Sequence, residues 1–141
     1  MNKSSINSSS KNSIVSIIVL ILVAILLIAI FVQGVKVEQK EELISISGGL
    51  FYSENITYSD IANVELRDNI EYGSRTNGAS LLNYKLGIFS NKEFGKYKLF
   101  VNDSINKFII VTYGEKVVVF NYKDLSKTIE LYNTLLEKAG L

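Results

Sequence analysis

The chain has 141 residues, of which 48% are hydrophobic, and its 15 Lys and Arg against 14 Asp and Glu leave a formal charge of +1. This near-neutral charge gives no electrostatic basis for binding nucleic acid through its phosphates. Because the sequence has no His and no Cys, it excludes a zinc site of the usual kind, a thiol nucleophile, a disulfide and a histidine general base. We therefore expect no metal, no cofactor and no nucleic-acid partner.

The longest apolar run covers residues 14–32, in which Ser16 is the only polar side chain. A helix rises about 1.5 Å per residue, so this run matches a hydrocarbon core about 30 Å thick. We predict a single transmembrane helix over 14–32. Residues 1–13 are rich in Ser and Asn and are predicted to be a disordered tail.

A cleaved signal peptide is the alternative interpretation of the same run. Lys3 and Lys11 form a basic flank, and Val32-Gln33-Gly34 resembles a small-residue cleavage site. The run is longer than the usual apolar region of a signal peptide, about 7–15 residues, which favours an uncleaved anchor. A buried core helix is excluded because about 100 remaining residues could not surround a helix that is apolar on all faces.

The charges beside the predicted span favour one orientation only slightly. Lys3, Lys11 and the α-amino group precede it, and Lys36 and Lys40 follow it. Counting positive charges places the amino terminus in the cytoplasm and the carboxy-terminal domain outside. We therefore expect a single-pass cell-membrane protein with an extracytoplasmic domain.

After the span, residues 33–42 carry alternating charges and are predicted to be a juxtamembrane connector without a fold of its own. Short apolar runs bounded by turn residues then recur about every ten residues, a pattern typical of antiparallel β-structure. The seven predicted strands cover 43–47, 50–56, 63–67, 86–89, 96–101, 107–112 and 116–121. Turn residues at 102–103 and 113–115 predict that the last three strands form consecutive hairpins.

Two segments predict what covers these strands. The runs 108–111 and 117–120 are continuously apolar, which indicates strands that are covered on both faces or packed under a helix. Apolar residues then recur every three or four positions, which predicts an amphipathic helix between Asp124 as its cap and Gly140 as its end. The predicted buried stripe is Leu125, Ile129, Tyr132, Leu135, Leu136 and Ala139.

Residues 68–84 lack clear periodicity and are predicted to be a long loop, a common location for functional residues. Within it, Arg75 with Asn77 and Gly78 forms a candidate site for a ligand or partner, because a guanidinium presents a fork of donors to an anion or carboxylate. The alternative is that Arg75 fixes the loop by pairing with an acid such as Glu71 or Asp68.

Charge is unevenly distributed along the second part of the chain. Residues 36–71 carry three basic and eight acidic side chains, a balance of −5, and residues 85–123 carry seven basic and three acidic ones, a balance of +4. The lysines of the basic half are a candidate contact with an anionic membrane surface. They are Lys85, Lys92, Lys96, Lys98, Lys107 and Lys116, and the first four are the preferred set. The alternative is a solvated strand face that the acidic half compensates.

Several short motifs between residues 43 and 137 resemble a known family. They are Ile56-Thr57-Tyr58-Ser59-Asp60-Ile61 leading to Val64-Glu65-Leu66, Arg75-Thr76-Asn77-Gly78, Gly87-Ile88-Phe89, Lys98-Leu99-Phe100-Val101 and Thr128-Ile129-Glu130-Leu131-Tyr132. These segments look like those of membrane-anchored bacterial pleckstrin-homology (PH) domain proteins.

The resemblance implies an α+β fold for residues 43–141: a seven-stranded antiparallel open barrel of two sheets, capped by the carboxy-terminal helix. It does not imply phosphoinositide binding, because the first strand–loop–strand holds Ser47-Gly48-Gly49 and lacks a basic cluster. Fold alone does not assign a ligand. We expect a non-enzymatic binding or scaffolding module whose partner is a protein or a lipid.

Two further functions stay open at this stage. A membrane-tethered Ser/Lys hydrolase would use Ser47 as its nucleophile and needs a desolvated lysine beside it. A carrier of lipid or another small ligand needs a cavity beneath the terminal helix, which Phe51, Phe89, Phe100, Phe108 and Phe120 would exclude if they filled the interior.

A calcium site is the weakest of the possibilities that the acidic residues offer. Asp68, Glu71 and Asp103 are the acids that such a site would use, but they lack the spacing of a binding loop. We therefore expect these three side chains to be solvated turn residues.

Overall fold

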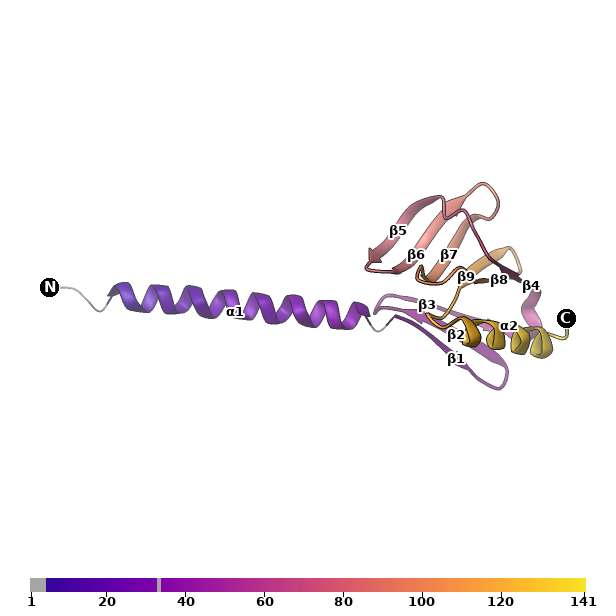
Figure 1. Ribbon diagram of the computed structural model, residues 1–141, viewed down its shortest axis with the longest axis horizontal. Helices are drawn as coiled ribbons and strands as arrows, with labels where there is room; N and C mark the ends of the chain where they lie inside the picture. The colour runs from indigo at the N-terminus through magenta and orange to yellow at the C-terminus, as the bar shows by residue number, and fades with distance from the viewer. Residues whose placement is uncertain (1–4, 33) are drawn as a thin grey trace. The chain divides into compact units, whose positions relative to one another are not determined.

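The computed structural model describes residues 5–32 and 34–141, and the chain divides into two compact units, residues 1–32 and 33–141. The first unit is helix α1 (Ser5–Val32), shown in Figure 1. Its segment Asn12–Ala29 is long and apolar enough to cross a membrane by length and composition.

Helix α1 begins at Ser5, so residues 5–13 are helical where the sequence predicts a disordered tail; residues 1–4 lie outside the described part of the chain. Once an apolar segment has formed a helix, each added residue gains one backbone hydrogen bond without a new nucleation cost. The Ser16 hydroxyl of the apolar run donates to the carbonyl oxygen of Asn12, which lies in this extension, at 2.9 Å.

The second unit is an α+β domain of two sheets and a carboxy-terminal helix (Figure 1). Its elements are β1 (Val35–Gln39), β2 (Leu43–Gly48), β3 (Tyr52–Thr57), the 3-10 turn η1 (Tyr58–Asp60), β4 (Ile61–Arg67), β5 (Ser74–Leu81), β6 (Tyr84–Asn91), β7 (Gly95–Asn102), β8 (Phe108–Tyr113), β9 (Lys116–Phe120) and α2 (Leu125–Ala139). The smaller sheet has the order β1-β2-β3, and the larger sheet has the order β4-β8-β9-β7-β6-β5.

Two strands lie where the sequence predicts irregular structure, so the described domain has nine strands and not seven. Strand β1 lies in the predicted connector and pairs along its whole length with β2. Its Val35 and Val37 alternate with charged residues, a period of two that the run of charges obscures. Strand β5 lies in the predicted loop 68–84 and pairs with β6. As an edge strand it is bonded on one side only, so it needs no apolar alternation.

The connection between β7 and β8 also differs from the prediction. The turn at residues 113–115 joins β8 and β9 into the expected hairpin, whereas β7 pairs with β9 in parallel and not with β8. The side chain of Asn121 supports this crossing. Its Oδ1 accepts from the Asn102 amide at 2.7 Å, and its Nδ2 donates to the carbonyl oxygens of Asn102 at 3.1 Å and Lys107 at 2.9 Å.

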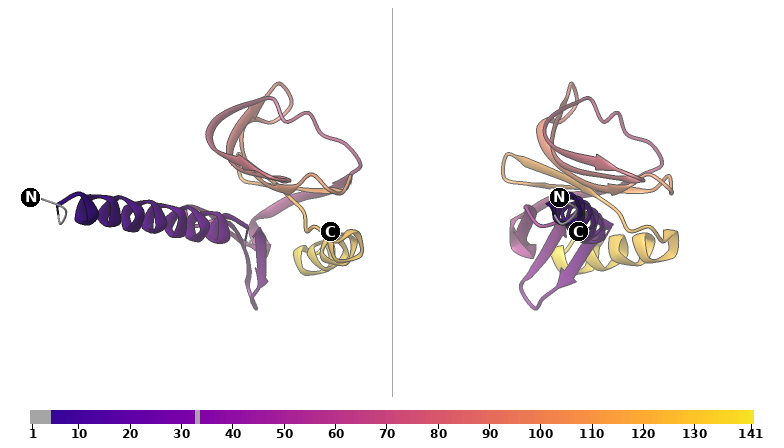
Figure 2. Two further views of the ribbon diagram at one scale, coloured as in Figure 1. Left: turned by 60° about the vertical axis from the view of Figure 1, so that its left-hand side comes forward. Right: turned by 90° about the vertical axis from the view of Figure 1, so that its left-hand side faces the viewer.

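Strands β8 and β9 in the middle of the larger sheet are buried on both faces, as the continuous apolar runs predict. One face carries a core cluster formed by Ile70, Phe89, Tyr97, Leu99, Val101, Phe108, Ile110 and Val119. The smaller sheet and α2 lie on the other face (Figure 2), where Gly48 of β2 packs against Leu86 and Phe100. Even-numbered residues of β7 therefore point toward the smaller sheet and odd-numbered ones toward the core cluster.

Helix α2 has the predicted ends. The Asp124 carboxylate accepts from the Lys127 amide at 2.9 Å, and Gly140 ends the helix with a φ of 71°. Its buried face, however, is formed by Thr128, Leu131 and Leu135, and the predicted stripe residues Leu125 and Ile129 are exposed. A buried threonine is tolerated because its hydroxyl donates to the Asp124 carbonyl oxygen at 2.8 Å.

Candidate functional site

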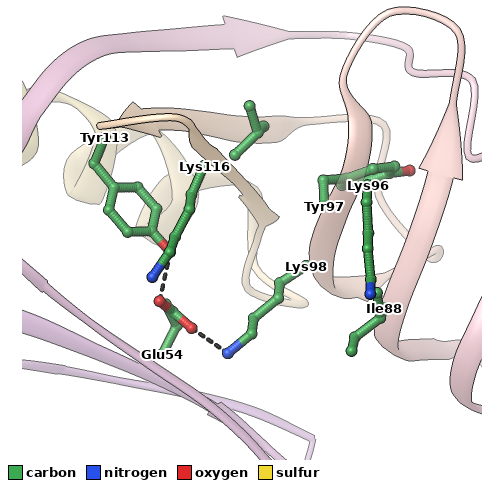
Figure 3. A pocket seen from close by; sticks show the side chains of 8 residues that line it. Glu54, Ile88, Lys96, Tyr97, Lys98, Tyr113 and Lys116 are labelled. Carbon is green, nitrogen blue, oxygen red and sulfur yellow. Dashed lines mark hydrogen bonds and ion pairs between the residues drawn. The ribbon is translucent and has the colours of Figure 1, made fainter.

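A glutamate on the inner face of β3 joins the two sheets of the domain. Glu54 lies on the same face of β3 as the buried Ile56 and points toward the larger sheet, and its side chain is only 10% exposed. One carboxylate oxygen accepts from the Tyr113 hydroxyl of β8 at 2.5 Å, and the other is paired with the ammonium group of Lys98 on β7 (Figure 3). Lys98 also donates to the Ser53 carbonyl oxygen at 2.9 Å, so both sheets are fixed at this point.

The surroundings of Glu54 set its protonation. Burial alone would raise the pKa of the Glu54 carboxyl, but the hydrogen bonds from Lys98 and Tyr113 favour the charged form, and the pKa lies below its ordinary value. Burial raises the pKa of the Tyr113 hydroxyl, and its bond to the Glu54 carboxylate raises it further. The pair therefore holds an ionised carboxylate and a neutral phenol at neutral pH.

We predict that Glu54→Gln destabilises the domain by about 1–3 kcal/mol at pH 7, because the ion pair is lost and a partly buried lysine is left without its anion. Since the folded-state pKa is lowered, the contribution of Glu54 is complete above its unfolded value of about 4.3 and is lost as pH falls through the folded value. The urea midpoints of wild type and Glu54→Gln, measured in detergent micelles, should therefore converge in acid. Exposed Glu41→Gln is the control, and a constant difference between wild type and Glu54→Gln across pH would contradict the assignment.

Beside this pair lies a pocket with a volume of about 170 Å³ (Figure 3). It is lined by Glu54, Ile88, Lys96, Tyr97, Lys98, Tyr113, Lys116 and Val117. The lining therefore contains three lysines and one carboxylate, and the apolar side chains of Ile88 and Val117 form part of the wall. The Lys116 ammonium lies 5.8 Å from the centre of the Tyr113 ring. This arrangement has an excess of positive charge and can receive an anion attached to an apolar group.

The structure brings together two of the four lysines preferred from the sequence. Lys96 and Lys98 line the pocket. Lys85 is instead paired with Asp103 and lies 4.7 Å from the centre of the Tyr72 ring, and Lys92 is exposed in the turn between β6 and β7.

Of the remaining two candidate lysines, one is paired with an acid and one lines the pocket. Lys107 is paired with Asp68, and Lys116 joins the pocket. Acids of the first half thus compensate part of the basic half, because Glu54 and Asp68 each hold one of its lysines.

The three residues singled out in the predicted loop lie on strand β5. Arg75 is exposed and donates to the Ser80 hydroxyl at 3.2 Å, and it is Lys107 that pairs with Asp68. The side-chain oxygen Oδ1 of Asn77 accepts a hydrogen bond from the Tyr52 hydroxyl at 2.9 Å. Gly78 has a φ of 140° and pairs directly with Gly87 of β6. Asn77 and Gly78 therefore have structural contacts that the sequence does not reveal.

The three acids considered for calcium do not converge in the described part of the chain. Asp103 accepts from the Tyr72 hydroxyl at 2.5 Å and pairs with Lys85, and Asp68 pairs with Lys107. Among the described residues, no group of three acidic side chains is placed to hold a metal ion.

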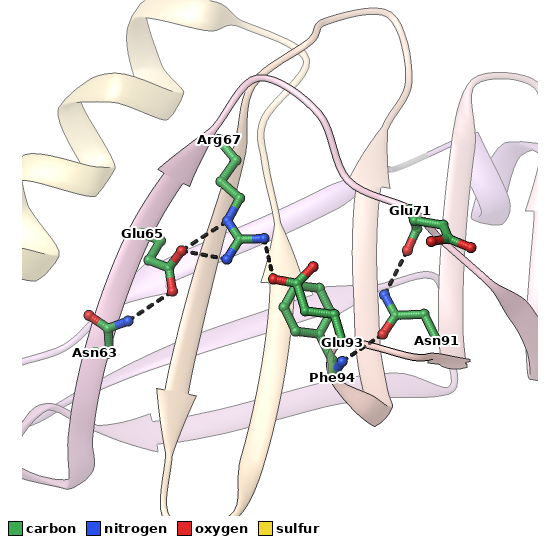
Figure 4. A network of polar contacts seen from close by, with 7 residues as sticks. All are labelled: Asn63, Glu65, Arg67, Glu71, Asn91, Glu93 and Phe94. Carbon is green, nitrogen blue, oxygen red and sulfur yellow. Dashed lines mark hydrogen bonds and ion pairs between the residues drawn. The ribbon is translucent and has the colours of Figure 1, made fainter.

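A second polar network closes one end of the larger sheet (Figure 4). Arg67 of β4 donates to Glu65 at 2.6 and 2.9 Å and to Glu93 in the β6–β7 turn at 2.5 Å. Asn91 donates to the Glu71 carbonyl oxygen at 2.7 Å and accepts from the Phe94 amide at 2.6 Å. These contacts hold the turn against the segment that follows β4, so the network is structural.

Two residues of the pocket, Glu54 and Tyr113, were not predicted from the sequence. The sequence held one clue to Glu54: strand alternation puts it on the same face as Tyr52 and Ile56. An acid on the face that carries a buried residue is a candidate for a buried ion pair. Tyr113 could not be linked to it, because the two residues are 59 positions apart and meet only through the packing of two sheets.

The family model of the bacterial PH domain matches residues 35–135. The match begins at the first residue of β1 and ends within α2, so it includes all nine strands of both sheets. No curated protein and no solved structure matches the chain. Because the matched residues make up more than half of the chain and coincide with the folded domain, the protein belongs to the bacterial PH domain family.

Proposed function

We propose that this protein is a non-enzymatic binding module that α1 holds at the cell membrane and that receives an anionic ligand in the pocket between its two sheets. The observation that carries the proposal is the grouping of Lys96, Lys98 and Lys116 around the single acid Glu54. With Lys98 neutralised by Glu54, two lysines retain charge for a ligand. The neighbouring Ile88 and Val117 favour a ligand whose anion is attached to an apolar group.

Membrane attachment makes weak binding sufficient for such a module. A tether confines the domain to a thin layer beside the bilayer and so raises its effective concentration toward other membrane-bound partners. The apolar segment Asn12–Ala29 supports this anchor by length and composition.

We further propose that the domain lies outside the cytoplasm, as the positive charges beside the span predict. The chain has no cysteine, so a single Lys92→Cys variant can be labelled in intact cells with a membrane-impermeant maleimide. Lys92 is exposed in a turn, which makes the variant structurally mild. Labelling that requires cell lysis would show that the domain faces the cytoplasm.

The pocket is tested with an acidic tripeptide, acetyl-Glu-Glu-Leu, titrated into the full-length protein in nanodiscs with isotopically labelled lysines. We expect the amide signals of Lys96, Lys98 and Lys116 to shift in one saturable process. The double variant Lys96→Gln/Lys116→Gln should bind about tenfold more weakly, because two charge contacts of about 0.5–1 kcal/mol each are lost. Lys98 is left in place since it pairs with Glu54.

The matched control for this titration removes two exposed lysines elsewhere, Lys123→Gln/Lys127→Gln, with the same change in net charge. It should leave the affinity unchanged apart from a small general electrostatic effect. If the control weakens binding as much as the pocket variant does, or if lysine signals shift all over the domain, the peptide responds to net charge and the pocket is not its site.

A second candidate contact, for a protein partner, is the free edge of β5. This strand is bonded to β6 only, and Arg75 on it is exposed. An unpaired strand edge offers backbone donors and acceptors to an added strand, and the guanidinium would add charge selectivity. Arg75→Ala should weaken such a partner without affecting the tripeptide titration.

The hydrolase alternative lacks the geometry that it needs. Ser47 is half-buried on β2, and its register partner on β1 is Lys36. Lys36 is exposed, whereas a lysine that activates a serine has to be desolvated. This supports a binding role over a Ser/Lys nucleophile.

The carrier alternative is opposed by side chains that fill the interior. Phe89, Phe100, Phe108 and Phe120 are all buried. Phe51 is an exception to the prediction, since 85% of it is exposed in the β2–β3 turn. The buried four occupy the space that a carried lipid would need.

A further inference from the structure

Three large apolar side chains are exposed on two turns of the domain. The β2–β3 turn carries Leu50, 65% exposed, and Phe51, 85% exposed, and the β5–β6 turn carries Leu82, 74% exposed. Exposed apolar side chains that gather at one end of a domain indicate a surface that another phase or molecule covers.

Leu82 also has an unfavourable backbone conformation. Its φ is 54°, and among the described residues no other non-glycine residue has a positive φ. The two-residue turn between Leu81 and Tyr84 is of the kind in which Asn or Gly is preferred. A leucine that is 74% exposed gains little from burial here and still carries the conformational cost, so the fold of the domain does not explain this side chain.

Both turns lie at the end of the domain where the chain enters from α1. The first residue of β1, Val35, is the register partner of Gly48, which immediately precedes the β2–β3 turn. A β-carbon on Gly34 would lie 2.7 Å from the hydroxyl oxygen of Tyr84, the residue that follows the β5–β6 turn. Figure 1 shows both turns at this end of the two sheets.

Chain connectivity identifies what covers these turns. Only residue 33 separates Gly34 from Val32, the last residue of α1. A single residue adds at most about 3.6 Å of reach, so a helix that crosses the bilayer as far as Val32 keeps Gly34 close to the membrane interface. Tyr52 and Tyr84, half-buried beside the two turns, are of the residue type enriched at membrane interfaces.

We propose that Leu50, Phe51 and Leu82 insert into the interfacial layer of the membrane beside the span and thereby fix the orientation of the domain on the bilayer. Three apolar contacts on two turns define a plane and would therefore give the domain one orientation on the bilayer. The proposal rests on the membrane anchor but not on the lysine pocket. It assigns the covering phase as lipid, since the junction already places these turns at the interface.

The chain has no tryptophan, so Phe51→Trp gives the full-length protein a single fluorescent reporter at the turn. In liposomes we expect its emission to shift to shorter wavelength and to be quenched by lipids brominated near the headgroup. The matched control is Leu141→Trp, also at an exposed apolar residue. It follows the end of α2, where Lys138 contacts the Lys40 carbonyl oxygen at the opposite end of β1 from Val35. This reporter should stay unquenched.

A second variant separates insertion from simple proximity. Leu82→Asn, placed in the Phe51→Trp background with Leu50→Asn, should reduce quenching of the reporter, while Leu82→Asn alone should raise the melting temperature because it relieves the turn. Quenching that is equal at positions 51 and 141, quenching that survives loss of Leu50 and Leu82, or a reporter at 51 that brominated lipid does not reach would each overturn the proposal. A blue-shifted but unquenched reporter would mean that protein covers the turns.

The failure of this inference is distinguishable from the failure of the anchor. If the protein is released from the liposomes by alkaline carbonate, α1 does not span the bilayer and the anchor itself is wrong. If the protein is retained and the reporter is unquenched, only the insertion of the turns is wrong.

Discussion

Gly87→Ala should separate β5 from β6 and cost more than about 4 kcal/mol of the free energy of unfolding. Gly87 and Gly78 face each other across the two strands with φ values of 132° and 140°, a conformation that L side chains rarely adopt. A β-carbon on Gly87 would also overlap the Asn77 carbonyl oxygen and lie 2.5 Å from the Gly78 α-carbon. Neither neighbour can retreat, because both are backbone atoms.

The matched control for this substitution is Gly114→Ala in the β8–β9 turn. Gly114 also has a positive φ, 51°, but nothing lies within 4 Å of the added β-carbon. It should cost only about 1 kcal/mol, the penalty of the left-handed conformation by itself. Urea denaturation followed by far-ultraviolet circular dichroism measures both variants. Equal losses for Gly87→Ala and Gly114→Ala would show that the close approach of β5 and β6 is not required.

The second large effect is expected at Asn121, a fully buried polar residue. Asn121→Leu should cost about 3–5 kcal/mol, because the amide of Asn102 and the carbonyl oxygens of Asn102 and Lys107 lose their partner inside the protein. Domains of this size have a total stability of about 5–15 kcal/mol, so the loss is a large fraction of it.

Two further variants identify the cause of that loss. Asn121→Asp keeps the size of the side chain and the acceptor but removes the donor and buries a charge, and it should be at least as harmful as leucine. Exposed Asn133→Leu on α2 is the control and should change the stability by less than about 0.5 kcal/mol. A mild effect of Asn121→Leu would mean that the crossing between β7 and β8 does not depend on this side chain.

Sequence patterns predicted the features that depend on neighbouring residues, namely the ends of α2 and the burial of two strands. Asp124 and Gly140 delimit α2, and the apolar runs of β8 and β9 correctly indicate strands buried on both faces. The parallel pairing of β7 with β9 was missed, because turn residues at 102–103 are equally compatible with a hairpin. The hydrogen bonds of Asn121 that stabilise the crossing involve residues 14 and 19 positions away and leave no local pattern.

In the candidate site too, the sequence predicted what depends on nearby residues and missed contacts between residues that are far apart in the chain. Lys96 and Lys98 could be selected from the sequence because strand alternation places them on one face. Their convergence with Lys116, and the role of Glu54 as the acid that neutralises Lys98, depend on strand order and on how the two sheets pack. The predicted loop location of Gly78 was wrong, because the residue lies in strand β5, where the backbone of β6 approaches it closely; its predicted role in binding stays a prediction.

The strand order of the larger sheet imposes a sequence of events during synthesis. The β5-β6-β7 meander pairs neighbours along the chain and can form early, but β4 has β8 as its partner and β7 receives β9, so the hairpin made last is inserted between strands made earlier. Such distant pairings slow folding, because loop entropy has to be lost before any contact is gained. Helix α1 ends at Val32, so it is synthesised long before β8 and β9. The apolar segment Asn12–Ala29, which is long enough to cross a membrane, is therefore complete before residues 108–120 pair with the edges of β4 and β7.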